Sequence, residues 1–215
     1  MKIILKLNDH SYSIFKHLRN KYLSIITFLI LILLNNYSKC EEFSQLRIDN
    51  FHNALEKSNF SEKKLSEKFE ILKITISDTF NYKKMIRFIY GFNWKKLNND
   101  SKQELSETFL DYITFNYVKR FDNLKMLEFN YKNKEKIDEN RILVKTIMIT
   151  LNEDPIKMNY VFEKHNDSWK IFDVLLDGSI SEISVKKSEF KNIILNEGVD
   201  SLIEKLKFKM QSLER

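Results

Sequence analysis

The sequence predicts one α+β domain in which helices come first, an antiparallel sheet follows and two helices close the chain. Apolar residues recur at three- and four-residue steps from Glu41 to Phe121, which is the period of amphipathic helices. After Phe121 the chain changes to β-branched and aromatic stretches separated by short polar turns. With only three glycines and one proline, the composition argues against a loop-rich or multi-domain protein.

The first half of the chain contains four helical patterns. Two short amphipathic helices are expected around residues 43–51 and 65–76. A third is expected to end at Gly91, because glycine is suited to a helix C-cap. A fourth, long helix is expected to begin with Ser101 as its N-cap, because Glu104 three residues later gives the capping-box spacing. Together they predict a helical region over residues 41–121.

Four stretches between residues 122 and 180 have the composition of strands: "LKMLEFNY", "RILVKTIMITL", "IKMNYVFEKH" and "SWKIFDVLLDG". Their short polar connections, "NKEKIDEN", "NEDP" and "NDS", predict an antiparallel meander. The second strand is apolar on both of its sides, so helices are expected to cover both faces of the sheet. The C-terminal helices are placed within residues 186–210.

The N-terminus has the pattern of a leader. Residues 1–40 carry six Lys and Arg residues against one Asp, which is +5 of the formal net charge of +6. The apolar run Tyr22–Leu34 is shorter than the roughly 20 residues that a membrane-spanning helix needs. We therefore predict that residues 1–40 are a secretory signal peptide and that residues 41–215 form a single exported domain. The small residues Ser38 and Cys40 fit cleavage after Cys40; an uncleaved anchor and a lipid-modified Cys40 are the alternatives.

Several kinds of site are excluded by composition. Cys40 is the only cysteine, so no intramolecular disulfide can form. After the leader only His52 and His165 remain, without a paired spacing that would suit a metal. Three isolated glycines cannot build a phosphate-binding loop. Because the basic charge lies mostly in the leader, we expect no nucleic-acid partner, and we expect no cofactor and no metal.

An enzyme would have to depend on a carboxylate of the last strand. Asp173 or Asp177 could act as a general base in a cavity lined by the sheet, with Tyr160 as a donor. Strict alternation along "SWKIFDVLLDGSI" instead turns Asp173 away from the apolar face, together with Trp169, Ile171 and Leu175. We therefore expect no catalytic residue, and predict that Asp173 fixes the docking of the C-terminal helices by accepting backbone N–H groups or by pairing with a lysine.

Residues spread along the chain resemble, in order and spacing, those of a known family: Trp169, the Asp173-Val174 pair, Gly178, Phe190, Gly198, Leu202 and Leu206, and upstream Phe80, Met85, Gly91, Trp94, Phe109 and Tyr117. The family is MlaC, a group of periplasmic lipid-binding proteins, and the resemblance covers roughly residues 45–210. Asn81, Asn99 and Leu105 stand where family members often have Asp, Pro and Phe. The segment from Gly178 to Phe190 is similar in length and sequence to the same segment of the hopanoid-associated branch of the family, HpnM.

The resemblance implies an NTF2-like fold, with a twisted antiparallel sheet of about four strands covered by N- and C-terminal helices that enclose an apolar pocket. It also implies a monomeric, non-enzymatic periplasmic carrier. Such a carrier moves phospholipid between an outer-membrane lipoprotein complex and an inner-membrane ABC transporter of the MCE type, and so maintains outer-membrane lipid asymmetry. The alternatives are a hopanoid-linked carrier, an exported enzyme with an NTF2-like cavity and a structural protein whose hollow is filled by side chains.

Aromatic, aliphatic and methionine side chains of the sheet and helices are the candidates for contact with lipid, because such side chains adapt to irregular apolar ligands. The predicted lipid-binding residues are Met85, Phe88, Phe109, Tyr112, Val144, Met148, Met158, Tyr160, Phe162, Phe172, Val174 and Leu176.

Overall fold

The computed structural model describes residues 21–28, 44–59, 63–122, 124, 126–151, 153–166 and 168–211. The chain divides into two units, Met1–Glu42 and Phe43–Arg215. In the first unit, residues 21–28 are helical, and the cleavage site predicted after Cys40 lies outside the described residues. The second unit contains the sheet and the helices that pack on it.

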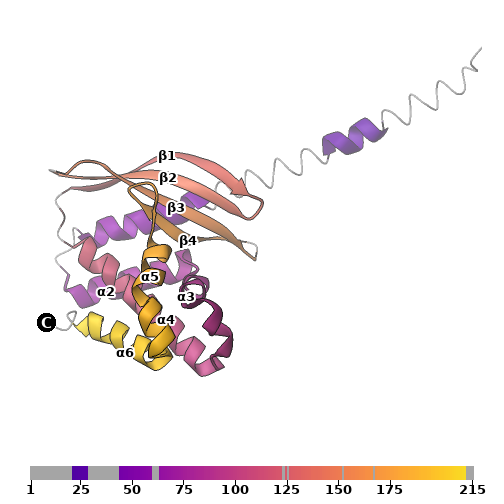
Figure 1. Ribbon diagram of the computed structural model, residues 1–215. Helices are drawn as coiled ribbons and strands as arrows, with labels where there is room; N and C mark the ends of the chain where they lie inside the picture. The colour runs from indigo at the N-terminus through magenta and orange to yellow at the C-terminus, as the bar shows by residue number, and fades with distance from the viewer. Residues whose placement is uncertain are drawn as a thin grey trace, which may run out of the picture. The chain divides into compact units, whose positions relative to one another are not determined.

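The helices of the second unit occupy residues 44–59, α2 (Leu65–Thr79), α3 (Tyr82–Tyr90), the 3₁₀ helix η1 (Gly91–Lys96), α4 (Asn99–Arg120), α5 (Glu182–Asn196) and α6 (Val199–Met210) (Figure 1). Gly91 ends α3 with a left-handed φ of 73°, which confirms the predicted cap. The predicted cap at Ser101 is wrong. Asn98 caps α4 instead, because its side-chain oxygen accepts the Ser101 backbone N–H at 2.7 Å.

The sheet is an antiparallel meander in the order β1-β2-β3-β4-β5, formed by β1 (Leu127–Asp138), β2 (Arg141–Thr150), β3 (Ile156–His165), β4 (Ser168–Leu176) and β5 (Ile180–Ser181). The predicted meander is confirmed, with one short strand more than expected. The first strand is longer than predicted, because residues 133–138 belong to β1 and not to a turn. An ion pair between Glu135 and Lys145 joins this part of β1 to β2.

A β-bulge interrupts the alternation of side chains along β4. Val161 of β3 lies opposite Asp173, whereas its neighbour Phe162 lies opposite Ile171, so Phe172 is an extra residue. Ile171 and Val174 consequently point to the same face and are both fully buried. The strict alternation that placed Ile171 on the opposite face from Val174 was therefore wrong.

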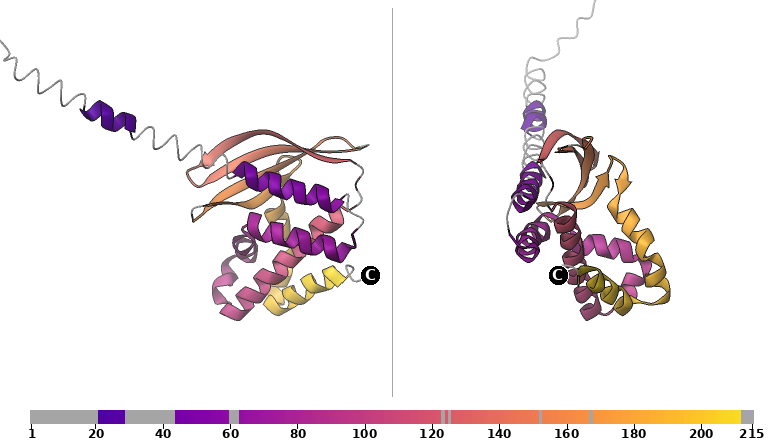
Figure 2. Two further views of the ribbon diagram at one scale, coloured as in Figure 1. Left: turned by 180° about the vertical axis from the view of Figure 1, so that it is seen from behind. Right: turned by 90° about the vertical axis from the view of Figure 1, so that its left-hand side faces the viewer.

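The helices of the second unit lie against one face of the sheet, which curves over them (Figure 2). On β2 the buried side chains alternate with half-buried ones that point to the other face, among them Leu143 and Ile147. No described helix covers that outer face, so the expectation of helices on both faces was wrong. Leu143 lies opposite Val161 on the outer face, and such cross-strand pairs shield one another without a covering layer.

A cluster of rings forms the core between the helix at residues 44–59 and the sheet. Phe51 packs edge-on against Phe80 at 5.0 Å and against Tyr117 at 5.1 Å between ring centroids. Beside it, His52 stacks on Phe129 at 3.8 Å, and its Nε2 lies 2.8 Å from the hydroxyl oxygen of Tyr160. Burial lowers the pKa of His52 from 6.5 to about 3, so the ring is neutral in the folded protein.

This buried histidine predicts an acid sensitivity of the fold. Protonation of His52 is favoured in the unfolded chain at pH values below 6.5 but in the folded chain only near pH 3. Its contribution to the free energy of unfolding is therefore present above pH 6.5 and is lost, at about 1.4 kcal/mol per pH unit, as the pH falls toward 3. Urea denaturation of the wild type and of His52→Gln at several pH values measures it. The wild type should lose stability more steeply than the variant, and equal slopes would contradict the assignment.

Candidate functional site

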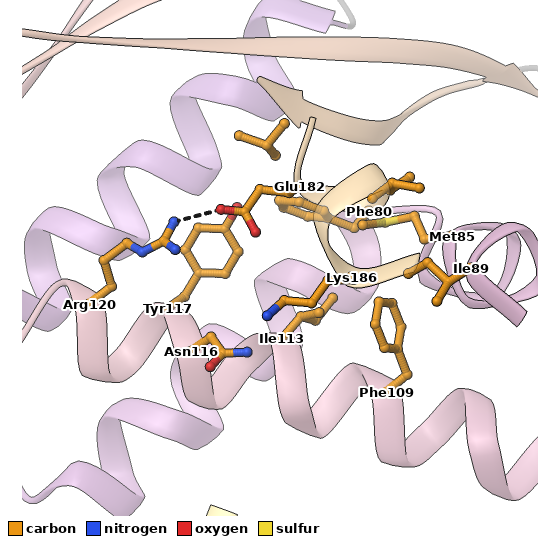
Figure 3. Close-up of a pocket in the computed structure, with 12 residues that line it drawn as sticks. Phe80, Met85, Ile89, Phe109, Ile113, Asn116, Tyr117, Arg120, Glu182 and Lys186 are labelled. Atoms are coloured by element: carbon orange, nitrogen blue, oxygen red, sulfur yellow. Dashed lines mark hydrogen bonds and ion pairs between the residues drawn. The ribbon is translucent and has the colours of Figure 1, made fainter. Parts of the chain in front are cut away.

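A cavity of about 90 Å³ lies between α3, α4, α5 and β4 (Figure 3). One end is apolar, and it is lined by Phe80, Met85, Ile89, Phe109, Ile113, Val174 and Ile183. The other end is polar, and it is lined by Asn116, Tyr117, Arg120, Glu182 and Lys186. Figure 3 shows this division, with Phe109, Ile89 and Met85 on one side and Arg120, Tyr117 and Asn116 on the other.

Helical spacing explains why α4 contributes to both ends. Phe109, Ile113 and Tyr117 are four residues apart, so they form one stripe along α4 that faces the cavity. Arg120 continues this stripe at the C-terminal end of the helix. On α3, Met85 and Ile89 have the same spacing and close the apolar end. The polarity of the cavity thus changes along the axis of α4.

The polar end is held by charged contacts. Arg120 donates to Glu182 at 3.1 Å, which connects the end of α4 to the first turn of α5. Lys186 donates to the Tyr112 hydroxyl at 3.0 Å and to Glu189 at 2.9 Å. Burial alone would lower the pKa of Lys186, but the hydrogen bonds to Glu189 and Tyr112 raise it above its ordinary value. Lys186 therefore keeps its positive charge at the mouth of an apolar space.

Asp173 fixes where α5 begins. Its Oδ1 accepts the backbone N–H of Ile183 at 3.1 Å and of Val174 at 2.9 Å, and its Oδ2 accepts the Ser181 hydroxyl at 2.6 Å. Ser181 in turn caps α5 by accepting the backbone N–H of Ser184. The prediction that Asp173 docks the C-terminal helices through backbone N–H groups is thereby confirmed. Helix α5 starts at Glu182, four residues before the predicted boundary at residue 186.

Burial raises the pKa of the Asp173 carboxyl, and the three hydrogen bonds offset only part of that effect. A raised pKa is also what a general base would show, so geometry has to separate the two roles. The carboxylate is occupied by its three donors, and Asp173 is not among the residues that line the cavity. Asp177, the other carboxylate considered, is exposed beyond the end of β4.

Three of the predicted lipid-binding residues, Met85, Phe109 and Val174, line the cavity. Five others are buried on the helix-covered face of the sheet but outside the cavity lining: Val144, Met148, Met158, Tyr160 and Phe162. Tyr112 packs against Phe190 next to the cavity, and Leu176 is half-buried at the end of β4. Contact with lipid stays a prediction for all of them.

Phe88 and Phe172 lie outside the cavity lining. Phe88 is 48% exposed, because it lies on the flank of the α3 stripe formed by Met85 and Ile89 and outside the cavity lining. The bulge at Phe172 takes this ring out of the alternation of β4, and it packs edge-on against Phe88 at 5.8 Å between ring centroids. Both are therefore placed on the outer side of the wall formed by α3.

Sequence reasoning missed nine residues of the cavity lining: Phe80, Ile89, Ile113, Asn116, Tyr117, Arg120, Glu182, Ile183 and Lys186. The four-residue spacing of Phe109, Ile113 and Tyr117 was available in the sequence and could have identified the stripe on α4. Nothing local pointed to Arg120 and Glu182, which are 62 residues apart and meet only in the fold.

The model of the MlaC family, described as MlaC protein, matches residues 46–208 of the chain. The chain belongs to the MlaC family. Its fold is also found in a phospholipid-binding protein from Ralstonia solanacearum, whose structure was solved in complex with a phospholipid. The two share 18% sequence identity with a TM-score of 0.69, over 82% of this chain and 99% of that one. No curated protein matches the sequence.

Among the residues that the structure describes, no group of three or more His, Cys, Asp or Glu side chains is arranged to hold a metal ion. No helix in the described part of the chain is long and apolar enough to cross a membrane.

The contacts of Asp173 predict its effect on stability. Asp173→Ala removes the acceptor of the Ile183 N–H and of the Ser181 hydroxyl, and should lower the free energy of unfolding by about 2 kcal/mol. Asp177→Asn is the matched control, since Asp177 is exposed and asparagine tolerates its left-handed φ of 50°; it should change stability by less than about 0.5 kcal/mol. Urea denaturation compares them, and equal midpoints would show that Asp173 does not anchor α5.

Proposed function

We propose that the chain is an exported lipid carrier that encloses one phospholipid molecule at a time. The observation that carries this proposal is the division of the cavity into an apolar end and a charged end. A phospholipid has the same division, with acyl chains and a charged head group. The phospholipid bound to the Ralstonia solanacearum protein of the same fold supports it.

The charged end favours a phospholipid over a wholly apolar ligand such as a hopanoid. Arg120 and Lys186 provide two cations, and Glu182 provides an anion beside them. A zwitterionic or anionic head group could exchange contacts with these side chains, whereas an apolar ring system offers no group that could replace their present bonds to Glu182, Glu189 and Tyr112.

Energetics explain why a lipid needs such a carrier. Two acyl chains of about 16 carbons each, at ~0.8 kcal/mol per methylene, represent on the order of 25 kcal/mol relative to water. A free lipid therefore does not cross an aqueous compartment at a useful rate. Transfer from a bilayer into an apolar pocket costs little, because both environments are apolar. The direction of net transport then depends on the partner proteins.

The cavity must enlarge before a lipid can enter it. Its volume of about 90 Å³ is below the roughly 300–1,000 Å³ of pockets that take drug-sized ligands. Its walls come from separate elements, namely α3 and α5 on one side and α4 and β4 on the others. Movement of α3 and α5 away from α4 would widen it without breaking any hydrogen bond of the sheet.

The proposal also covers export, cellular location and partner complexes. The basic leader with its short apolar run supports export by a cleaved signal peptide and a periplasmic location. We propose that the monomeric carrier exchanges lipid with an outer-membrane lipoprotein complex and with an inner-membrane ABC transporter of the MCE type. A non-enzymatic role is supported by the engaged carboxylate of Asp173, so Asp173→Asn should leave lipid transfer unchanged.

Native mass spectrometry of the protein, expressed with its own leader and purified after export, tests the ligand. One phospholipid per chain would support the proposal. A pentacyclic hydrocarbon in its place would favour the hopanoid-linked carrier. A protein that is consistently empty and that takes up no lipid from vesicles would contradict both.

Filling the cavity should block lipid uptake. Val174→Phe places a larger side chain in the cavity, and it should reduce bound phospholipid at least tenfold while the protein remains folded. Leu175→Phe is the matched control, because Leu175 is the next residue of β4 and lies opposite Asn159 on the outer face. Phospholipid per chain, measured by native mass spectrometry, compares the two. Equal loss in both variants, or no loss in Val174→Phe, would show that the cavity does not hold the lipid.

A further inference from the structure

A positively charged surface lies on the outer side of α3, the helix whose inner side lines the cavity. Residues 81–99 contain five lysines and arginines and no acidic residue: Lys83, Lys84, Arg87, Lys95 and Lys96. The two faces of α3 are sharply different. Met85 and Ile89 point inward to the cavity, while Arg87 and Phe88 are exposed.

Helix α5 extends this charged surface. Lys187 and Lys191 are exposed on α5, while Ile183 and Lys186 of the same helix face the cavity. The Lys187 ammonium lies 4.5 Å from the centre of the Phe88 ring, which joins the two helices at their surface. We call the surface formed by residues 83–96 and by Lys187 and Lys191 the α3–α5 face.

Large apolar side chains stand among these cations. Phe92 is 78% exposed and Leu195 is 61% exposed. An open hollow of about 970 Å³ lies beside Phe88, Phe92 and Trp94. A second, of about 600 Å³, lies between Phe92 and Leu195. Exposed aromatic side chains among lysines and arginines are unusual for a surface that contacts only water.

The cations of this face are largely unpaired. Lys84 forms an ion pair with Glu163 at 2.7 Å. Within the described part of the chain, Lys83, Arg87, Lys95 and Lys187 form no ion pair. The face therefore carries a net positive charge that a negatively charged partner could neutralise.

We infer that the α3–α5 face docks on the surface of an anionic lipid bilayer. Lysines and arginines near such a surface each strengthen binding by about fivefold, and Phe, Trp and Leu insert at the level of the head groups. Phe92 and Trp94 on η1, flanked by Arg87 and Lys95, provide both kinds of contact. A protein partner is favoured less, because residues 81–99 offer charge of one sign only, and Glu163 beside them is already paired with Lys84.

This docking gives the proposed carrier a defined orientation, and in that respect it rests on the proposed function. Helices α3 and α5 form the wall between the bilayer and the cavity, since Met85, Ile89 and Ile183 lie on its inner side. In this orientation the bilayer is in contact with α3 and α5, the helices that have to move for the cavity to enlarge. Lipid would then pass between α3 and α5 without crossing water.

Vesicle sedimentation tests the docking. The protein is expressed with its own leader, purified after export and mixed with vesicles of phosphatidylcholine alone or of phosphatidylcholine and phosphatidylglycerol in equal parts. The wild type should bind the mixed vesicles and should bind them more weakly as salt is added. The triple variant Lys83→Gln, Arg87→Gln, Lys95→Gln should bind roughly 100-fold more weakly. Phe92→Ser should bind about tenfold more weakly at every salt concentration.

A matched triple variant separates position from total charge. Lys57→Gln, Lys64→Gln, Lys119→Gln removes the same charge from exposed lysines on other elements and should bind within a few fold of the wild type. Equal losses in the two triple variants, or equal binding of the wild type to both vesicle types, would overturn the inference. The inference would also be overturned if the wild type bound neither vesicle type and the α3–α5 triple variant lost lipid exchange with a membrane protein complex. That result would assign the face to a protein partner.

Phospholipid bound to the purified α3–α5 triple variant distinguishes this inference from the proposed function. None of the three substituted side chains lines the cavity, so the variant should retain the wild-type amount of phospholipid. Weak vesicle binding with full lipid content supports docking through this face. Full vesicle binding by an empty wild-type protein would contradict the carrier and leave the docking supported.

Discussion

The carboxylate of Asp173 connects the sheet to the helix that closes the cavity. A helix N-terminus presents backbone N–H groups without partners and a partial positive charge, and a carboxylate from a neighbouring strand satisfies both. Asp173 does this for Ile183 and also holds Ser181, the cap of α5. Because Val174 is the next residue of the strand and itself lines the cavity, one pair of residues sets both the position of α5 and the surface that it faces.

The bulge at Phe172 decides which side chains of β4 share the buried face. Ile171 and Val174 both point to the helices because one extra residue lies between them, and a regular strand would have turned one of them outward. The displaced Phe172 packs against Phe88 and so supports the outer side of α3. The bulge therefore affects packing on both sides of α3: it places Ile171 and Val174 on the buried face and Phe172 against Phe88.

Much of the fold could be predicted from the spacing of apolar residues, because a helix buries every third or fourth residue and a strand buries every second one. The order of elements, the C-cap at Gly91 and the docking role of Asp173 were all predicted from local patterns. The β4 bulge was not, because nothing in the composition of "KIFDV" marks an extra residue. The polar end of the cavity was missed for a different reason: Arg120 and Glu182 belong to separate elements, and only the tertiary structure brings them together. The apolar end was partly recovered, since Met85, Phe109 and Val174 were among the predicted lipid-binding residues, whereas Ile113 of the same stripe on α4 was missed.

The two-sided wall of α3 and α5 determines how the cavity can open. The sheet is joined by continuous backbone hydrogen bonds, and separating its strands would expose many of them at once. Helix α3 has nine residues and meets α5 through side chains alone, among them the Lys187–Phe88 contact. Side-chain contacts of this kind can be exchanged for contacts with lipid at little net cost, whereas strand pairing cannot. Both helices are tied to β4 at their first turns, α5 through Asp173 and α3 through the backbone N–H of Asn81, which donates to the Ile171 carbonyl at 2.8 Å, so an opening movement would pivot about these ends.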